Sequence, residues 1–130
     1  MRQAFITMII AALVMASCGK EKKADTAAAD AAGMYYNKLI DGDYESFVAG
    51  MYFSDSIPAG YREQLVANAK MFMYEQGKAH GGVDTAFALR QQRDSAATTA
   101  EVFMSIVFND SSREEIVVPM IEENGFWFMR

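Results

Sequence analysis

The chain of 130 residues has few of the side chains that build disulfides and metal centres, with one cysteine and one histidine. A single thiol excludes an intramolecular disulfide. A structural zinc site takes four ligands, which this pair of residues does not supply. Methionine thioethers can hold copper, but copper tracts cluster methionine with histidine, whereas these methionines are dispersed. We therefore predict no metal and no cofactor, and we expect the methionines to pack in the core.

Basic side chains are also in the minority, with 12 Lys and Arg against 17 Asp and Glu and a net charge of −5. An acidic balance disfavours nucleic acid as a partner, because binding depends on cations that neutralise phosphates. It equally disfavours contact between the folded part and anionic lipid headgroups. The charge identifies no partner.

The chain lacks an apolar run long enough to cross a membrane comfortably, which takes about 20 residues. Its most apolar segment, residues 4–16 (AFITMIIAALVMA), follows Arg2 and ends in small residues, Ala16 and Ser17. A positive start, a short apolar stretch and a small-residue cleavage site are together typical of a secretory signal. We predict a signal peptide over residues 1–17.

The cysteine stands directly after this segment, and residues 13–18 (LVMASC) resemble the lipobox of bacterial lipoproteins. The resemblance implies cleavage between Ser17 and Cys18, a diacylglycerol thioether on Cys18 and an acyl chain such as palmitate on the new amino group. Two or three acyl chains give stable anchoring where one would not. By the same resemblance, Gly19 in place of an aspartate favours the outer membrane, on its periplasmic face or at the cell surface. An ordinary buried cysteine is the alternative.

Cleavage would remove Arg2 and no acid, which leaves 11 basic and 17 acidic side chains and a net charge of −6. Residues 18–24 then form a short charged tether, and residues 25–130 form one domain of a length that supports a core without disulfides. Helical spacing dominates the first half of this domain. The expected helices start at Asp25 or Thr26 and end at Gly42, cover residues 44–52 after a cap at Asp43, and run from about Tyr61 to Gln76, with residues 77–82 (GKAHGG) as a loop.

The hydrophobic period changes from 3.6 to 2 in the second half, which indicates strands. The expected strands cover residues 83–93, 98–108, 115–121 and 126–130. Asn124-Gly125 predicts a tight primed hairpin turn, and Pro119 predicts a sheet edge or a bulge because it has no N–H for the ladder. The predicted class is α+β, with N-terminal helices packed on a curved antiparallel sheet of three to four strands.

Two short motifs carry a resemblance to a known fold. The first helix ends in Asp41-Gly42-Asp43-Tyr44, and the last strands meet at Asn124-Gly125-Phe126-Trp127. Residues 25–130 resemble the small nuclear transport factor 2-like (NTF2-like), or cystatin-like, domains of bacterial lipoproteins, a class of unknown function. The resemblance implies that Trp127 packs into the core. Strand alternation puts Phe126 and Phe128 together on the face opposite Trp127, and we expect one of the two faces to line a cleft or an interface.

Enzymes of this broad fold, of the isomerase and dehydratase type, place an Asp or His base opposite a tyrosine or an acid in an apolar cavity. Asp84, Tyr35, Tyr74 and Asp94 are the residues that such a reading could nominate. Acids at strand ends are usually solvated, and tyrosines on helix stripes usually belong to the core. His80, the sole histidine, lies in the glycine segment, where we expect an exposed side chain without an orienting acid.

The sequence therefore predicts no catalytic residues. We expect a non-enzymatic, lipid-anchored module of the cell envelope that binds a protein partner or a small apolar ligand. An enzyme is the first alternative, and it requires an enclosed pocket of about 300 Å³ or more in which an acid and a tyrosine converge. A structural homodimer formed through an exposed sheet face is the second.

Overall fold

The computed structural model describes residues 25–94 and 98–130. The predicted signal peptide, the lipidation site at Cys18 and the tether up to residue 24 lie outside these residues. Within them, no helix is long and apolar enough to cross a membrane. The elements are, in chain order, α2 (Ala27–Ile40), α3 (Tyr44–Ala49), α4 (Ala59–His80), β1 (Val83–Asp94), β2 (Thr99–Phe108), β3 (Arg113–Glu123) and β4 (Phe126–Met129).

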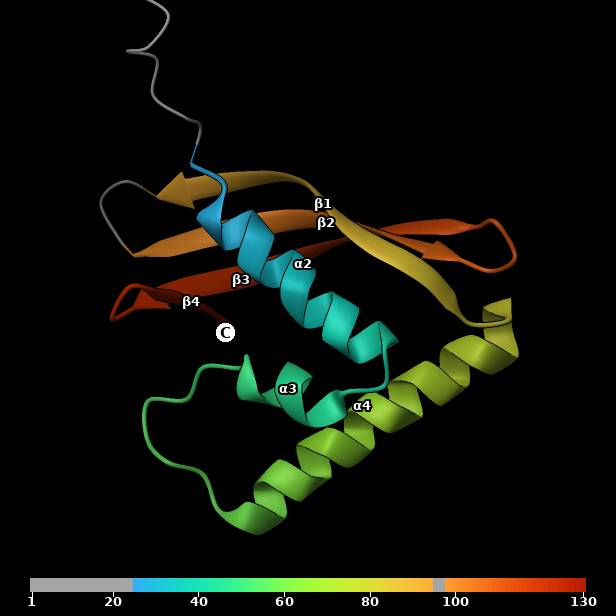
Figure 1. Ribbon diagram of the computed structural model, residues 1–130, viewed down its shortest axis with the longest axis horizontal. Helices are drawn as coiled ribbons and strands as arrows, with labels where there is room; N and C mark the ends of the chain where they lie inside the picture. The colour runs from blue at the N-terminus through green and yellow to red at the C-terminus, as the bar shows by residue number, and fades with distance from the viewer. Residues whose placement is uncertain (1–24, 95–97) are drawn as a thin grey trace, which may run out of the picture.

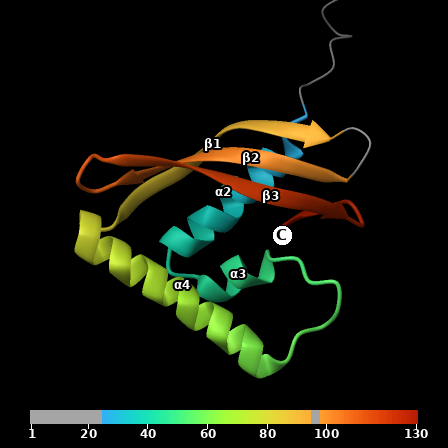
Figure 2. The ribbon, with the colours of Figure 1, turned by 180° about the vertical axis from the view of Figure 1, so that it is seen from behind.

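The four strands form one antiparallel sheet in the order β1-β2-β3-β4, so each strand pairs with its neighbour in the sequence. The helix α2 lies across one face of the twisted sheet, and α3 and α4 continue from it on the same side (Figure 1). No described helix covers the opposite face (Figure 2). Phe126, which alternates with the buried Trp127 along β4, is 68% exposed. The predicted α+β class with helices packed on a curved antiparallel sheet is confirmed, and the homodimer stays a prediction.

The first two helices begin and end close to the predicted signals. The Asp25 carboxylate accepts a hydrogen bond from the Ala27 N–H at 3.2 Å, and Gly42 takes a left-handed φ of +84° after α2. Asp43 caps α3 by accepting from the Ser46 N–H at 3.2 Å. These bonds satisfy backbone groups that a helix end leaves without partners.

The helix α3 is shorter than the predicted stretch, which extended to Tyr52. The chain leaves the helix at Gly50 because its backbone pairs with β4 instead. The Met129 N–H donates to the Gly50 carbonyl at 2.7 Å, and the Tyr52 N–H donates to the Met129 carbonyl at 2.6 Å. Tertiary pairing with the last strand therefore overrides helical spacing in this segment.

The helix α4 is longer at both ends than the predicted 61–76. It begins after Pro58, whose carbonyl accepts from the Arg62 N–H at 3.1 Å, and it continues to His80. The expected loop over residues 77–82 was therefore wrong: Gly77 lies inside the helix, and the left-handed Gly81, with φ +76°, ends it. Glycine in a helix interior costs only about 1 kcal/mol, which tertiary contacts at the helix end can offset.

The core lies between α2 and the inner face of the sheet. The expected helix stripe is confirmed by the buried Ala28, Ala32 and Leu39, and the expected strand face is confirmed by Val102, Met104, Ile106 and Phe108, all of them buried. Trp127 is also in the core, as the resemblance implied, with 5% of its surface exposed. Burying this one face of a half-buried sheet is what fixes the strand register.

The last strands join at the predicted hairpin turn, where Asn124 and Gly125 both have positive φ, of 54° and 83°. Pro119 lies opposite Glu101 in a continuous register, so the bulge alternative was wrong. Its carbonyl accepts from the Arg130 N–H at 3.0 Å, on the side where β4 has just ended. The N–H and carbonyl of a strand residue point to the same side, so the missing N–H faces the end of the ladder. The edge alternative describes this position correctly.

Candidate functional site

An apolar cleft lies between the three helices α2, α3 and α4 and the strands β2 and β3 of the sheet. It has a volume of about 480 Å³. The sheet contributes Ile106 and Ile116, and the helices contribute Leu39, Phe47, Leu65 and Phe72. We call this space the helix–sheet cleft. It is of the size that small-molecule sites commonly have, and its walls are of the same chemical character.

A smaller cleft of about 330 Å³ adjoins it and shares the walls formed by Tyr36, Phe47, Met51 and Leu65. It continues the apolar surface toward Met129 and Phe53. Because the two clefts share these residues, they form one elongated groove beside α3.

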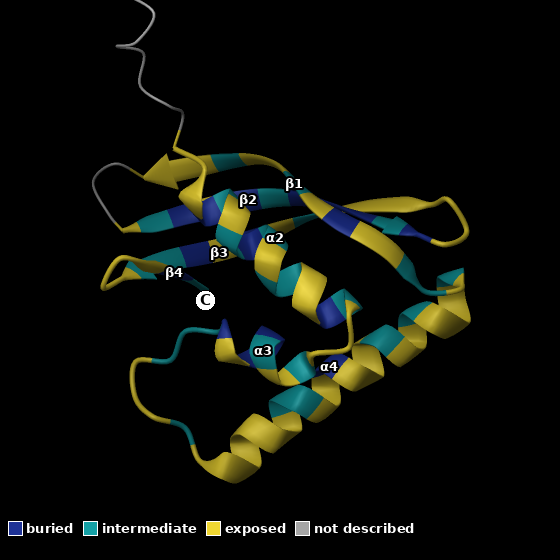
Figure 3. Ribbon diagram, in the orientation of Figure 1, coloured by how far each residue is buried: buried dark blue, intermediate teal, exposed yellow. Residues whose placement is uncertain are grey.

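The helix–sheet cleft exists because α4 packs against the rest of the domain along only part of its length. Ala69 is the one buried residue of this helix, and Phe72, on the same stripe, is 40% exposed. Most of the helix is exposed along its length (Figure 3). A small alanine at the contact point leaves space on either side, which larger residues on the same stripe do not fill.

Three polar side chains border this apolar space. The Tyr36 ring packs edge-on against Phe47 with centroids 5.4 Å apart, and burial raises the pKa of its hydroxyl, so the phenol is neutral at neutral pH. The Asn68 Oδ1 accepts a hydrogen bond from the Gln64 side chain at 2.9 Å. Glu114 is exposed and is the one charged residue in the wall. The cleft can thus hold an apolar body and offer a few fixed hydrogen-bonding groups.

The C-terminal end of α4 is fixed to the β2–β3 turn by a cluster around His80. Its Nδ1 lies 2.8 Å from the Asp110 Oδ2 and 3.3 Å from the Ser112 Oγ, and its ring stacks on Phe108 at 4.3 Å. The Asp110 N–H also donates to the His80 carbonyl at 3.1 Å. The expectation of an exposed histidine without an orienting acid was therefore wrong, because the helix carries His80, 34% exposed, onto the turn.

Serine, histidine and aspartate meet in this cluster, but the geometry is not that of a catalytic triad. A triad needs the serine on one ring nitrogen and the aspartate on the other, so that the ring can take the serine proton. Here both oxygens approach the same Nδ1. Hydrogen bonds from Ser112 and then His80 lower the pKa of Asp110 to about 2, so its carboxylate is ionised and ties the turn together.

The other residues that the sequence nominated do not meet in either cleft. The Tyr35 hydroxyl donates to the Trp127 carbonyl at 2.6 Å, a bond that joins α2 to β4. Asp84 is exposed at the start of β1, and Tyr74 is exposed on α4, where the Lys78 ammonium lies 5.4 Å from its ring centroid. Asp94 is at the far end of β1.

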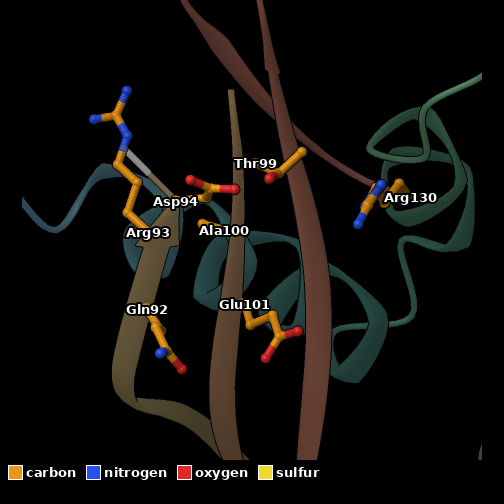
Figure 4. A pocket seen from close by; sticks show the side chains of 7 residues that line it. All are labelled: Gln92, Arg93, Asp94, Thr99, Ala100, Glu101 and Arg130. Atoms are coloured by element: carbon orange, nitrogen blue, oxygen red, sulfur yellow. The ribbon is translucent and has the colours of Figure 1, made fainter. Parts of the chain in front are cut away.

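Asp94 lines a separate polar pocket of about 510 Å³ at that end of the sheet. Its carboxylate points toward Thr99, its partner across the strands, while the Arg93 guanidinium points away (Figure 4). The Arg93 guanidinium is instead bonded to Asp25 and lies 3.5 Å from Glu122. Arg130 stands apart from both (Figure 4). The charges of this pocket do not converge on one point, so it is the weaker candidate.

The methionines confirm the expectation of core packing in part. Met104, Met120 and Met129 are buried, whereas Met34 and Met71 are exposed on different helices. Among residues 25–94 and 98–130, no group of three or more histidine, cysteine, aspartate or glutamate side chains is arranged to hold a metal ion.

The sequence did not single out Tyr36 or Glu114, the tyrosine and the acid that border the helix–sheet cleft. Tyr36 follows the nominated Tyr35 and points about 100° away from it around the helix, toward α3. Glu114 lies opposite Ile106 in the sheet register. The predicted inner face of β2, which includes Ile106, could therefore have indicated that Glu114 is on the inner face of β3. The position of α4 over that face could not be read from spacing alone.

The comparison with solved structures finds a relative in fold. A structure from Campylobacter jejuni, described as a candidate NTF2-like transpeptidase, superposes with a TM-score of 0.62 at 15% sequence identity. The match covers 77% of this chain and 94% of that chain. It confirms the NTF2-like fold. No protein-family model matches the sequence, and no curated protein matches it.

Proposed function

We propose that this protein is a lipid-anchored module of the cell envelope that binds a small apolar ligand in the helix–sheet cleft and does not catalyse a reaction. The observation that carries the proposal is the cleft itself, about 480 Å³ of space walled by aliphatic and aromatic side chains with three polar groups at its border. Apolar surface left open to water is costly, and an apolar ligand would cover it.

The envelope location rests on the sequence. A signal peptide over residues 1–17 and the lipobox ending in Cys18 would leave acyl chains in the membrane and the domain beside it. Gly19, in place of an aspartate, favours the outer membrane as that membrane. Replacing Cys18 with alanine should abolish incorporation of a labelled fatty acid and move the protein out of the membrane fraction. Continued labelling of the Cys18→Ala protein would contradict the lipid anchor.

An enzyme of the isomerase type is the second candidate, because Tyr36 and Glu114 border the same apolar space. Binding is the better-supported function, since Glu114 is exposed to water, and a base for proton transfer works best in a site that excludes water. The transpeptidase description of the structural relative is not carried over. Acyl transfer needs a nucleophile activated by a base. Ser112 and Asp110 both approach the Nδ1 of His80, so the aspartate does not orient the ring to take a proton from the serine.

The test is a titration of residues 19–130, the mature chain without the lipidated Cys18, with an uncharged naphthylamine dye whose emission rises in apolar surroundings. We expect the wild-type chain to bind the dye and Asn68→Trp, which places a large ring at the border of the cleft, to weaken binding at least fivefold. Met71→Trp is the matched control, because Met71 is 59% exposed on the same helix and does not border the cleft. Equal binding by all three chains would contradict the proposal.

A further inference from the structure

The wall of the helix–sheet cleft carries charge of one sign. It includes one acidic side chain, Glu114, and no lysine or arginine. None of the ion pairs among the described residues includes Glu114. On α4, the Lys70 ammonium lies 5.9 Å from the centroid of the Tyr44 ring. A ligand that fills this cleft therefore meets an uncompensated carboxylate at its border.

Glu114 occupies a different setting from the acid that follows it. Glu114 lies opposite Ile106, whose side chain is buried in the inner face and also borders the cleft. Glu115 lies opposite Ser105, and its Oε1 is 3.6 Å from the Arg90 Nη1. Successive strand residues point to opposite faces, so the two carboxylates belong to opposite faces of the sheet, and the one without an ion pair among the described residues faces the cleft.

The rest of the wall favours a cation for a second reason. Three aromatic residues, Tyr36, Phe47 and Phe72, border the same space. Aromatic rings attract organic cations over their faces, while an anion would be repelled by the carboxylate at the border. A neutral apolar molecule would fit the cleft but would gain no attraction from the carboxylate at its border.

From this charge pattern we infer that the ligand of the helix–sheet cleft is a cationic amphiphile. Its apolar body packs between α4 and the sheet, and its protonated amino group lies at the border beside Glu114. The inference rests on the proposed function and adds the chemical class of the ligand to it. An exposed ion pair stabilises by up to about 1 kcal/mol, which corresponds to about a fivefold preference for a cation.

The experiment uses the lipidated protein in nanodiscs of zwitterionic phosphatidylcholine. Two photoreactive probes carry the same ten-carbon chain and diazirine, one with a terminal amine and one with a terminal carboxylate. Mass spectrometry of the peptides after irradiation measures labelling of the α4 and β3 segments that border the cleft. We expect the amine probe to label these segments about fivefold more than the carboxylate probe. The preference should fall to about one in Glu114→Gln and persist in the matched control Glu115→Gln.

The outcomes separate this inference from the proposed function. Labelling of the cleft by both probes with equal yield, or an amine preference that Glu114→Gln leaves unchanged, would overturn the cationic ligand while leaving a binding cleft. An amine preference that disappears equally in Glu115→Gln would also overturn it, because the cause would then be the general acidity of the strand. Absence of labelling in the cleft by either probe would overturn the proposed function together with the inference.

Discussion

Gly50 lies where α3 ends and the chain pairs with β4, and its lack of a side chain lets the Tyr35 ring pack closely against its backbone. Its backbone is helical, with φ −77° and ψ −5°, so alanine would suit the conformation. An added Cβ would nevertheless lie 2.4 Å from Cδ1 and 2.5 Å from Cε1 of the Tyr35 ring. Gly50→Ala thus introduces a steric clash with no accompanying backbone strain, which makes its cost a direct measure of packing at this junction.

The Tyr35 ring cannot move aside freely, because its hydroxyl donates to the Trp127 carbonyl at 2.6 Å. Adding a methyl group to a filled site costs about 1–3 kcal/mol. Weakening the hydrogen bond from Tyr35 to Trp127 costs about 1 kcal/mol more, which is the net contribution of a typical hydrogen bond. We therefore expect Gly50→Ala to lower the free energy of unfolding by about 2–4 kcal/mol. In a Tyr35→Ala background the same substitution should cost less than about 1 kcal/mol, since the ring is gone.

The assay is urea unfolding of residues 19–130, followed by the fluorescence of Trp127, the single tryptophan, which is buried in the folded state. The matched control is Gly33→Ala in α2, where an added Cβ has nothing within 4 Å. Alanine in a helix interior should there raise the free energy of unfolding by up to about 1 kcal/mol. A cost of Gly50→Ala below about 0.5 kcal/mol, or an equal cost without Tyr35, would refute the reasoning.

Two further predictions concern the end of α4 and the turn that holds it. Hydrogen bonds, first from Ser112, lower the pKa of Asp110 from 3.8 to about 2 in the folded chain, so its carboxylate stabilises the fold above about pH 4 and this contribution is lost as the pH falls through about 2. Asp110→Asn should therefore flatten the dependence of the free energy of unfolding on pH between 4 and 2, and an unchanged slope would contradict it. Gly77→Ala should raise the free energy of unfolding by about 1 kcal/mol, because Gly77 lies inside a helix and an added Cβ would have nothing within 4 Å. Gly82→Ala should lower it, because φ at Gly82 is +107° and an added Cβ would lie 2.9 Å from the Asn109 Nδ2. Chemical denaturation of both variants tests the two signs.

The fold could be predicted where the signal is local. Gly42 and Asp43 mark a helix break and a cap by their own chemistry, and Asn124-Gly125 supplies the positive φ that a primed hairpin needs. Alternation put Trp127 on the face opposite Phe126 and Phe128, and the resemblance to NTF2-like domains indicated that this side chain is the buried one, as it is. Each of these features depends on a few neighbouring residues, so the sequence alone contains it.

The helix ends at Ala49 and His80 depend on contacts with β4 and the β2–β3 turn, far away in the sequence, which local spacing does not record. The cleft depends on them too. Tyr36 on α2 and Glu114 on β3 border one space, and α4 forms another of its walls. The nominated Tyr35 was one residue away, and a helix turns that difference into another face.

Native mass spectrometry of the lipidated protein, released from isolated membranes under mild conditions, tests the central proposal most directly. We predict that part of the wild-type protein carries a small apolar molecule in addition to its acyl chains, and that Asn68→Trp, with the border of the helix–sheet cleft obstructed, carries much less of it. A wild-type protein without such a molecule, or the same added mass at the same occupancy in both proteins, would contradict a binding function for the cleft.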